Sequence, residues 1–253
     1  GRYANHLLHW PSPWGEGFPG WHIECSAIAR RVLGQPFDIH TGGVDHIGTH
    51  HTNEIAQSEA AYDQPLAHYW LHAEHLQVEG RRMGKSEGNY ITLETIQKRG
   101  YQPLDYRYLV LTAHYRSKMN FTWESLEGAA KALASVRRLV RESDTTTTSA
   151  AAREAIWQAL ADDLDTPRAI AMLHESRSGA LWQAFDHILG LKLNEHPDDV
   201  IPEAVISLME EREAARRAHD WAKADALRHD IEAAGYQIMD TPQGAEVTKR
   251  IGE

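Results

Sequence analysis

Short apolar segments separated by glycine joints fill the first third of the chain, residues 1–92. This pattern is typical of strands that alternate with helices. A helix is predicted from Gly20 to Leu33. Its apolar positions, which are expected to face inward, are Ile23, Ala27, Ala29 and Val32.

A strand, a glycine turn and a second helix are predicted next. Phe37–His40 is a short strand candidate that Gly42 and Gly43 are expected to end, and a helix opens near Thr49. This helix carries His50, Glu54 and Ser58 at four-residue steps, so the three side chains share one face. In such an α/β unit, functional groups gather at the carboxyl end of the strand.

From residue 93 onward the pattern turns helical and the strand signals fade. Apolar side chains recur at three- and four-residue steps from Trp123 to Val140, which is typical of a bundle helix, with Thr122 as its expected N-cap. Three or four further helices are expected. Thr166 and Pro167 mark the start of one of them, and the last runs from about Val205 to Ala234.

A low-complexity run of Ser, Asp and Thr at residues 143–150 has nothing to bury and is predicted to be a linker. The fold class is therefore α/β followed by an all-α helical bundle. Three domains are expected: residues 1–92, a helical connection at 93–142, and a bundle at 143–253.

Composition narrows the protein class. With 253 residues, 42% hydrophobic content, 25% charged residues and a net charge of -10, the chain is a folded protein and is unlike a generic nucleic-acid coat. No apolar run approaches the roughly 20 residues of a membrane span, and no signal peptide opens the chain, so we expect a cytoplasmic protein without membrane contact. The irregular stretch after Gly1 suggests a start in mid-domain.

Histidine is abundant, with 16 residues crowded toward the first third of the chain, and Cys25 is the single cysteine. A thiolate, an imidazole and a carboxylate are the ligand types that Zn²⁺ accepts, and Cys25, His50 and Glu54 supply one of each. Taken alone, the three residues have another interpretation: a buried Cys is usually a small hydrophobe, and a His/Glu pair one turn apart is usually a surface or capping pair.

The sequence motifs around these residues are more specific evidence than the three residue types alone. The stretches in question are Trp10-Pro11-Ser12-Pro13-Trp14-Gly15, Gly20-Trp21-His22-Ile23-Glu24-Cys25-Ser26, Asp38-Ile39-His40, and His50-His51 followed by Asn53-Glu54-Ile55-Ala56-Gln57-Ser58-Glu59. In sequence and spacing they resemble the cysteinyl-tRNA synthetases. The resemblance implies a partial Rossmann-like catalytic domain of class I synthetases in residues 1–92.

The same resemblance implies ligands and a substrate pocket. In the family, residues matching Cys25, His50 and Glu54 bind zinc, and residues matching Trp21 and His40 line the cysteine pocket. Packing of Trp21 in the core is the alternative. The family's fourth zinc ligand is a Cys near the N-terminus, and no second Cys is present here. A borderline metal prefers a substrate thiolate to a hydroxyl, so zinc would reject serine.

A second motif, Arg82-Met83-Gly84-Lys85-Ser86, resembles the KMSKS loop of class I synthetases. The resemblance implies ATP binding, with Mg²⁺, by Met83, Lys85 and Ser86. Lys85 is the expected catalytic cation, because charge accumulates on the α-phosphate and on the departing pyrophosphate. Arg82 and Gly84 depart from the family pattern: Gly84 makes the loop more flexible, and Arg82 keeps the positive charge of the family's lysine but not its geometry.

The resemblance extends into the bundle and implies tRNA(Cys) as a partner. It rests on Ala161-Asp162-Asp163-Leu164-Asp165-Thr166-Pro167 and on Asp240-Thr241-Pro242-Gln243-Gly244. After Gly244 the family pattern is lost, so the small anticodon-contacting module is expected to be absent or reduced. The family's HIGH-containing half precedes the Gly20 motif, and only residues 1–19 do so here, so a separate N-terminal half is a candidate partner.

The leading hypothesis is a cysteine–tRNA ligase that makes cysteinyl adenylate from cysteine and ATP and transfers cysteine to tRNA(Cys), with the site incomplete in this chain alone. A non-catalytic synthetase paralogue that binds tRNA or protein is one alternative. A mycothiol-pathway cysteine ligase, which shares the catalytic motifs, is another. A zinc hydrolase is disfavoured because the chain has no HExxH motif.

Overall fold

The computed structural model describes residues 7–18, 20–84, 87–143, 148–195, 202–241 and 244–249. The chain divides into two compact units. Unit 1 comprises Gly1–Leu76 and Tyr115–Met119, and unit 2 comprises Gln77–His114 and Asn120–Glu253. None of the helices in the described ranges is long and apolar enough to span a membrane.

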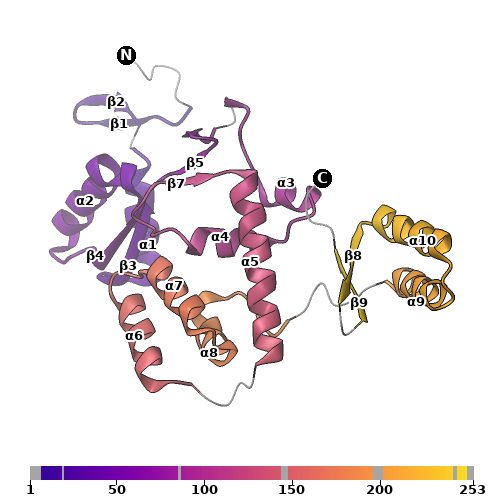
Figure 1. Cartoon of the computed structure of the whole chain (residues 1–253). Coiled ribbons are helices and arrows are strands. Elements are labelled where there is room, and N and C mark those ends of the chain that lie inside the picture. Colours follow the sequence, from indigo (N-terminus) through magenta and orange to yellow (C-terminus); the bar gives the residue numbers. More distant parts are fainter. Residues whose placement is uncertain are drawn as a thin grey trace. The chain divides into compact units, whose positions relative to one another are not determined.

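Unit 1 is an α/β unit behind an N-terminal hairpin. Its main elements are β1 (Trp10–Ser12), β2 (Gly15–Gly17), α1 (His22–Leu33), β3 (Phe37–Gly43), α2 (Thr52–Tyr62) and β4 (Ala67–Ala73). Strands β1 and β2 pair antiparallel. Strands β3 and β4 pair in parallel, and α2 lies between them in the chain, which makes a βαβ crossover (Figure 1). The predicted alternation of helices and strands is confirmed.

The connection from β3 to α2 is helical from its start. It consists of a 3₁₀ turn, η1 (Val44–His46), and a π-helical turn, η2 (Ile47–His51). The strand ends at Gly43, so the two glycines that were expected to end it are its last two residues. His50, Glu54 and Ser58 are all buried, so the predicted shared face is confirmed and points inward.

The register of β3 and β4 brings His40, Trp70 and His72 together on one face of the sheet. His40 lies beside Trp70, and Gly42 lies beside His72. Side chains two residues apart in a strand share a face, so these four positions lie on the same side of the sheet. A Cβ atom at Gly42 would lie 2.6 Å from Cε1 of His51, so the glycine makes room for that ring.

The expected inward face of α1 is wrong in most positions. Val32 is 72% exposed, Ile23 is 42% exposed, and Ala27 is also exposed. Only Ala29 packs against the small core of this unit, which is formed by Phe37, Leu66 and Ala67. The described sheet here has two strands and therefore offers too little surface to cover the whole apolar stripe.

Unit 2 is mainly helical. Its helices are α3 (Leu93–Lys98), α4 (Pro103–Leu111), α5 (Trp123–Glu142), α6 (Ala150–Ala161), α7 (Thr166–Ser176), α8 (Gly179–Leu189), α9 (Glu203–Arg217) and α10 (Trp221–Ala233). Three short strands, β5 (Leu76–Val78), β6 (Arg81–Arg82) and β7 (Met119–Phe121), pair in the order β6-β5-β7. The predicted fold class, α/β followed by a helical region, is confirmed.

Helix α5 follows its sequence signals closely. Thr122 caps it: its hydroxyl oxygen accepts a hydrogen bond from the backbone N–H of Ser125, and the hydroxyl oxygen of Ser125 accepts one from the backbone N–H of Thr122. The predicted apolar stripe is buried throughout: Leu126, Ala129, Leu133, Val136 and Val140. Helix α7 begins at Thr166 as predicted, but its cap is Asp165, which accepts from the N–H of Arg168.

The C-terminal helix prediction needs correction. Instead of one helix from Val205 to Ala234, α9 and α10 are separate, because the side chain of Asp220 caps α10 at the N–H of Lys223 and His219 adopts a φ of 59°. Five helices, not three or four, follow residue 148 in the described residues. A hairpin of β8 (Tyr236–Thr241) and β9 (Gly244–Lys249) follows, which the sequence did not predict.

Helix α9 is tied to β8 by a carboxylate. Asp240 accepts a bidentate pair from Arg212, at 3.0 and 3.1 Å, and a third hydrogen bond of 2.6 Å from Arg216. Arg212 is 4% exposed. These hydrogen bonds, chiefly those from Arg212, lower the pKa of Asp240 from 3.8 to about 2.

The Asp240 pKa gives a testable pH dependence. Because the carboxyl pKa is lower in the folded chain than in the unfolded one, the ionised Asp240 contributes its full share to the free energy of unfolding above pH 3.8. This contribution is lost as the pH falls toward 2. In an NMR titration, we expect Asp240 to titrate near pH 2, and Arg212→Gln should raise its pKa toward the ordinary value. Arg217→Gln, an exposed change one turn along α9, is the control and should leave the pKa unchanged. A normal Asp240 pKa in the unmodified chain would contradict the pairing.

Candidate metal and cysteine site

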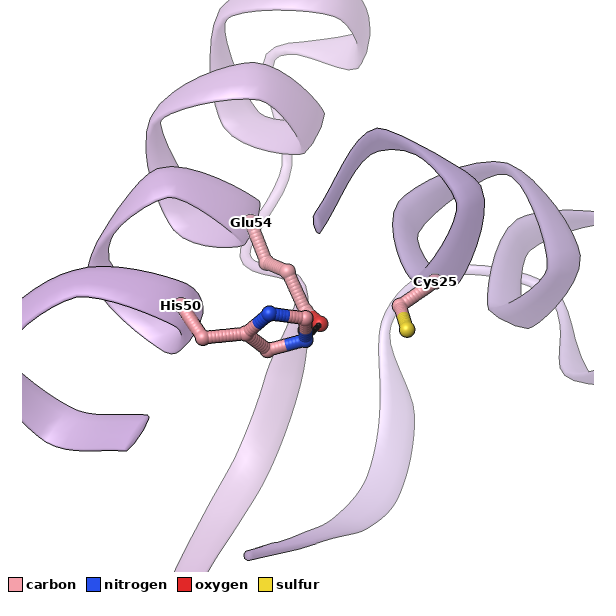
Figure 2. A group of neighbouring side chains, drawn as sticks. All are labelled: Cys25, His50 and Glu54. Atoms are coloured by element: carbon pink, nitrogen blue, oxygen red, sulfur yellow. Dashed lines mark ion pairs between the residues drawn. The ribbon is translucent and has the colours of Figure 1, made fainter. Parts of the chain in front are cut away.

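The three predicted metal ligands meet in unit 1. One ligand atom each of Cys25, His50 and Glu54 lies within 4.8 Å of the others. Figure 2 shows His50 and Glu54 side by side on one helical segment, with Cys25 facing them from another helix. Cys25 comes from α1, His50 from the π turn η2, and Glu54 from the first turn of α2.

Glu54 is the most deeply buried member of the set. Its residue is 1% exposed, and one carboxylate oxygen, Oε2, hydrogen-bonds to Nε2 of His40. The other, Oε1, lies 2.6 Å from Nε2 of His50 but outside hydrogen-bond geometry, and is left without a hydrogen-bond partner among the described residues. A buried carboxylate with two imidazole nitrogens and a thiol around it is stabilised when a cation lies among these groups. The donor set therefore fits a metal ion.

Trp21 contacts the His50 ring at Nδ1, the nitrogen that faces away from Glu54. Its indole N–H donates to Nδ1 of His50, and the two rings meet edge to face with centroids 5.3 Å apart. An indole nitrogen can only donate, so Nδ1 accepts and the proton of the neutral imidazole is on Nε2. Metal binding through Nε2 would move that proton to Nδ1, which requires Trp21 to release this hydrogen bond.

The thiol of Cys25 is protonated in this arrangement. Partial burial, and then the negative charge of Glu54, raise the pKa of Cys25 above 9.0. The carboxylate that disfavours a lone thiolate would favour a cation between the two groups. Metal binding would therefore displace the thiol proton, and its affinity should rise with pH.

Four more ring side chains, three histidines and one tryptophan, form a cluster that contacts Glu54 through His40. His51 Nδ1 and His72 Nε2 are 2.8 Å apart, Trp70 stacks on His40 at 4.6 Å between ring centroids, and His40 and His51 are 4.4 Å apart on the same measure. Burial, then the neighbouring His40, lowers the pKa of His51 to about 4, and burial also lowers that of His72. His51 and His72 are therefore neutral imidazoles at pH 7.

Both residues assigned to the cysteine pocket adjoin the metal set. Trp21 is 64% exposed, which rules out the alternative that it is a core residue, and it contacts His50. His40 is half-buried and contacts Glu54. Their role in binding cysteine stays a prediction.

Sequence reasoning missed His51, Trp70 and His72 as parts of this cluster. The alternation of Trp70 and His72 on β4 was the available signal, because residues two apart share a face of a strand. Their partner strand and its register were needed to place that face against the π turn.

The nucleotide-loop candidates lie in unit 2. Met83 is half-buried, and the backbone N–H of Gly84 donates to Asn89 Oδ1 at 2.9 Å, while Asn89 Nδ2 donates to the carbonyl of Arg82 at 3.0 Å. Asn89 thus ties the start of the loop to its end, a role that the sequence did not reveal. Lys85 and Ser86 lie outside the described residues, so their assignments stay predictions.

Comparison with known families identifies both parts of the chain. Residues 3–131 match the model of the class I (C) tRNA synthetase catalytic domain, and residues 198–247 match the cysteinyl-tRNA ligase anticodon binding domain. The chain belongs to the cysteinyl-tRNA synthetase family. The second match overturns the expectation that the anticodon-contacting module is absent or reduced. The departure from the family sequence after Gly244 affects only the end of that domain.

Individual relatives agree with the family assignment. Cysteine–tRNA ligase 1 of Burkholderia lata is 47% identical and matches 94% of this chain but 53% of its own length. The cysteine–tRNA ligases of Opitutus terrae and Chlamydia pneumoniae are 43% and 39% identical, over 53% and 57% of their lengths. This member of the cysteinyl-tRNA synthetase family therefore spans little more than half the length of these relatives.

A solved class I synthetase shows the same fold. The LeuRS in a ternary complex with tRNA and LeuAMS from Agrobacterium radiobacter K84 aligns with a TM-score of 0.52 and 16% identity, over 76% of this chain and 31% of its own. At this identity the likeness concerns the fold alone.

Proposed function

We propose that this chain is part of a cysteine–tRNA ligase, which activates cysteine with ATP to cysteinyl adenylate and then transfers cysteine to tRNA(Cys). The observation that carries the proposal is the convergence of Cys25, His50 and Glu54 within 4.8 Å, beside Trp21 and His40. A thiol-selective pocket is what distinguishes cysteine from serine. The site of the reaction is the cytoplasm, where protein synthesis takes place.

Cys25, His50 and Glu54 would hold one Zn²⁺. The bound ion would supply an open coordination position that prefers the thiolate of cysteine to the hydroxyl of serine. Around it, the exposed Trp21 indole would cover the amino acid, and His40 would orient Glu54 through their hydrogen bond. A site that requires such a specific contact rejects an analogue by about 10⁴-fold or more, whereas an apolar pocket reaches about 10²-fold.

In the nucleotide part, Met83, Lys85 and Ser86 would bind ATP with Mg²⁺. The Lys85 ammonium would stabilise the charge that develops on the α-phosphate and on pyrophosphate as the cysteine carboxylate attacks. The hydrogen bonds of Asn89 to Gly84 and Arg82 hold the start of the loop next to its end. The remainder of the catalytic domain, with its HIGH motif, would be supplied by a preceding segment or by a separate N-terminal half.

The predicted domain division, at residues 92 and 142, is kept as part of this proposal, with the bundle of residues 143–253 binding tRNA. The anticodon-domain match favours tRNA(Cys) as acceptor over the amino sugar of the mycothiol pathway. A non-catalytic paralogue would keep the tRNA-binding bundle and show no adenylation.

Cysteine-dependent exchange of pyrophosphate into ATP tests the function and the role of Lys85. In the enzyme with its complete catalytic domain, Lys85→Ala should lower the exchange rate by about 10²-fold with little change in the KM for cysteine, because the charge acts on phosphate and not on the thiol site. Cys25→Ala should mainly raise the KM for cysteine, because it removes a group of the thiol site and leaves the phosphate contacts in place.

Arg82→Ala, a change of a neighbouring cation, is the matched control and should have a much smaller effect. Wild-type exchange with Lys85→Ala and none with Arg82→Ala would show that another cation of the loop does this work. Absence of any exchange in the unmodified enzyme would favour the non-catalytic paralogue.

A further inference from the structure

A second group of metal-binding side chains lies on the far side of the Glu54 carboxylate. One ligand atom each of His40, His51 and Glu54 lies within 4.8 Å of the others. This group contains no sulfur. It differs from the cysteine-containing group in two of its three members and shares only Glu54.

Each member is held by a different element. His40 comes from β3, His51 from the π turn η2, and Glu54 from α2. His51 is 3% exposed and Glu54 is 1% exposed, while His40 is half-buried and retains a path to solvent. Two imidazoles and one carboxylate are a donor set of catalytic zinc sites, in which one position stays open.

The surroundings orient these side chains as they would metal ligands. His72 hydrogen-bonds to His51 at 2.8 Å, and Trp70 stacks on His40. Such contacts fix the orientation of a ligating ring, and their loss typically weakens metal affinity by about 10–100-fold. The missing side chain at Gly42 makes the space, because a Cβ there would lie 2.6 Å from Cε1 of His51.

The two oxygens of Glu54 face different groups. Oε1 lies near His50, on the side of Cys25, and Oε2 contacts His40. One carboxylate can therefore serve a cation on either side. We propose that His40, His51 and Glu54 form a second, thiol-free site for a divalent cation such as Zn²⁺ or Co²⁺. This site binds the cation when the site that contains Cys25 cannot.

This inference shares Glu54 with the proposed zinc site but does not depend on it. Sulfur distinguishes the two sites, because a thiolate bound to Co²⁺ gives a near-ultraviolet charge-transfer absorption band and imidazole or carboxylate does not. The probe is Co²⁺ alone, added to the whole chain, with bound metal measured by equilibrium dialysis and the ligand type by absorption.

Cys25→Ala should remove the charge-transfer band and still bind one Co²⁺. Adding His40→Ala to that variant should weaken the remaining binding by at least about 10-fold, and Gly42→Ala, which changes no ligand, should do the same by displacing the His51 ring. His68→Ala, an exposed histidine of β4, is the matched control and should leave the binding unchanged.

Loss of all Co²⁺ binding in Cys25→Ala would overturn the second site. So would equal weakening by His40→Ala and His68→Ala. Thermal unfolding checks that each variant is folded, and His40→Asn replaces His40→Ala if the latter is not. If the unmodified chain binds Co²⁺ without the charge-transfer band, the proposed zinc site fails while the second site stands.

Discussion

Glu54→Gln is expected to reduce zinc binding by more than about 100-fold, because it removes the one charged ligand that serves both metal-binding groups. Loss of a side chain that only supports a ligand already costs about 10–100-fold, and Glu54 is itself a proposed ligand. The amide keeps the size of the side chain but leaves a neutral group facing His50 and His40. Zinc content after dialysis against a zinc buffer measures the effect.

The control is Glu24→Gln, an exposed change beside Cys25 that removes a negative charge but no proposed ligand. It should retain zinc. If both variants kept full zinc, neither group containing Glu54 would be a metal site. If both lost it to the same degree, general electrostatics near α1 would account for binding, and the ligand assignment would be wrong.

Trp182→Ala is the second change with a large expected effect, on stability instead of binding. Trp182 is 0% exposed in α8, and its ring meets that of His174 edge to face at 5.0 Å and lies 6.5 Å from that of Tyr108. Truncation of a buried aromatic residue to Ala costs about 3–5 kcal/mol. Urea unfolding followed by circular dichroism should show this loss of unfolding free energy.

Trp182→Phe is the matched control. The indole N–H of Trp182 is buried and has no hydrogen-bond partner in the described part of the chain, so its removal orphans no other group. The phenyl ring keeps most of the buried apolar area, and its cost should be less than half that of Ala. Equal costs for the two variants would mean that the α8 core tolerates no repacking.

Local signals in the sequence predicted the parts of the fold that depend on neighbours along the chain. The stripe of α5 and its Thr122 cap follow from three- and four-residue spacing, as does the shared face of His50 and Glu54. Convergence with Cys25 was inferred from the family resemblance, and the geometry agrees with that inference.

Features that depend on distant segments were not predicted. The placement of His72 beside His51 requires the parallel register in which Gly42 faces His72. The exposed stripe of α1 carries the same apolar spacing as a buried one, and only the extent of the neighbouring sheet decides which it is. The β8–β9 hairpin likewise gains its core from α9 and α10, through Val205, Ile231 and Ile238.

The π turn η2 has a consequence for how such a cluster arises. A single π turn within an α-helix corresponds to one extra residue in the helical repeat, and consecutive residues of an ordinary α-helix point about 100° apart. Here the adjacent His50 and His51 are both buried and face different neighbours, Trp21 and His72. Deletion of one residue from Ile47–His51 would restore the regular repeat and turn every upstream side chain relative to Glu54. The width of this turn therefore sets how the side chains before Thr52 are aimed relative to the Glu54 carboxylate.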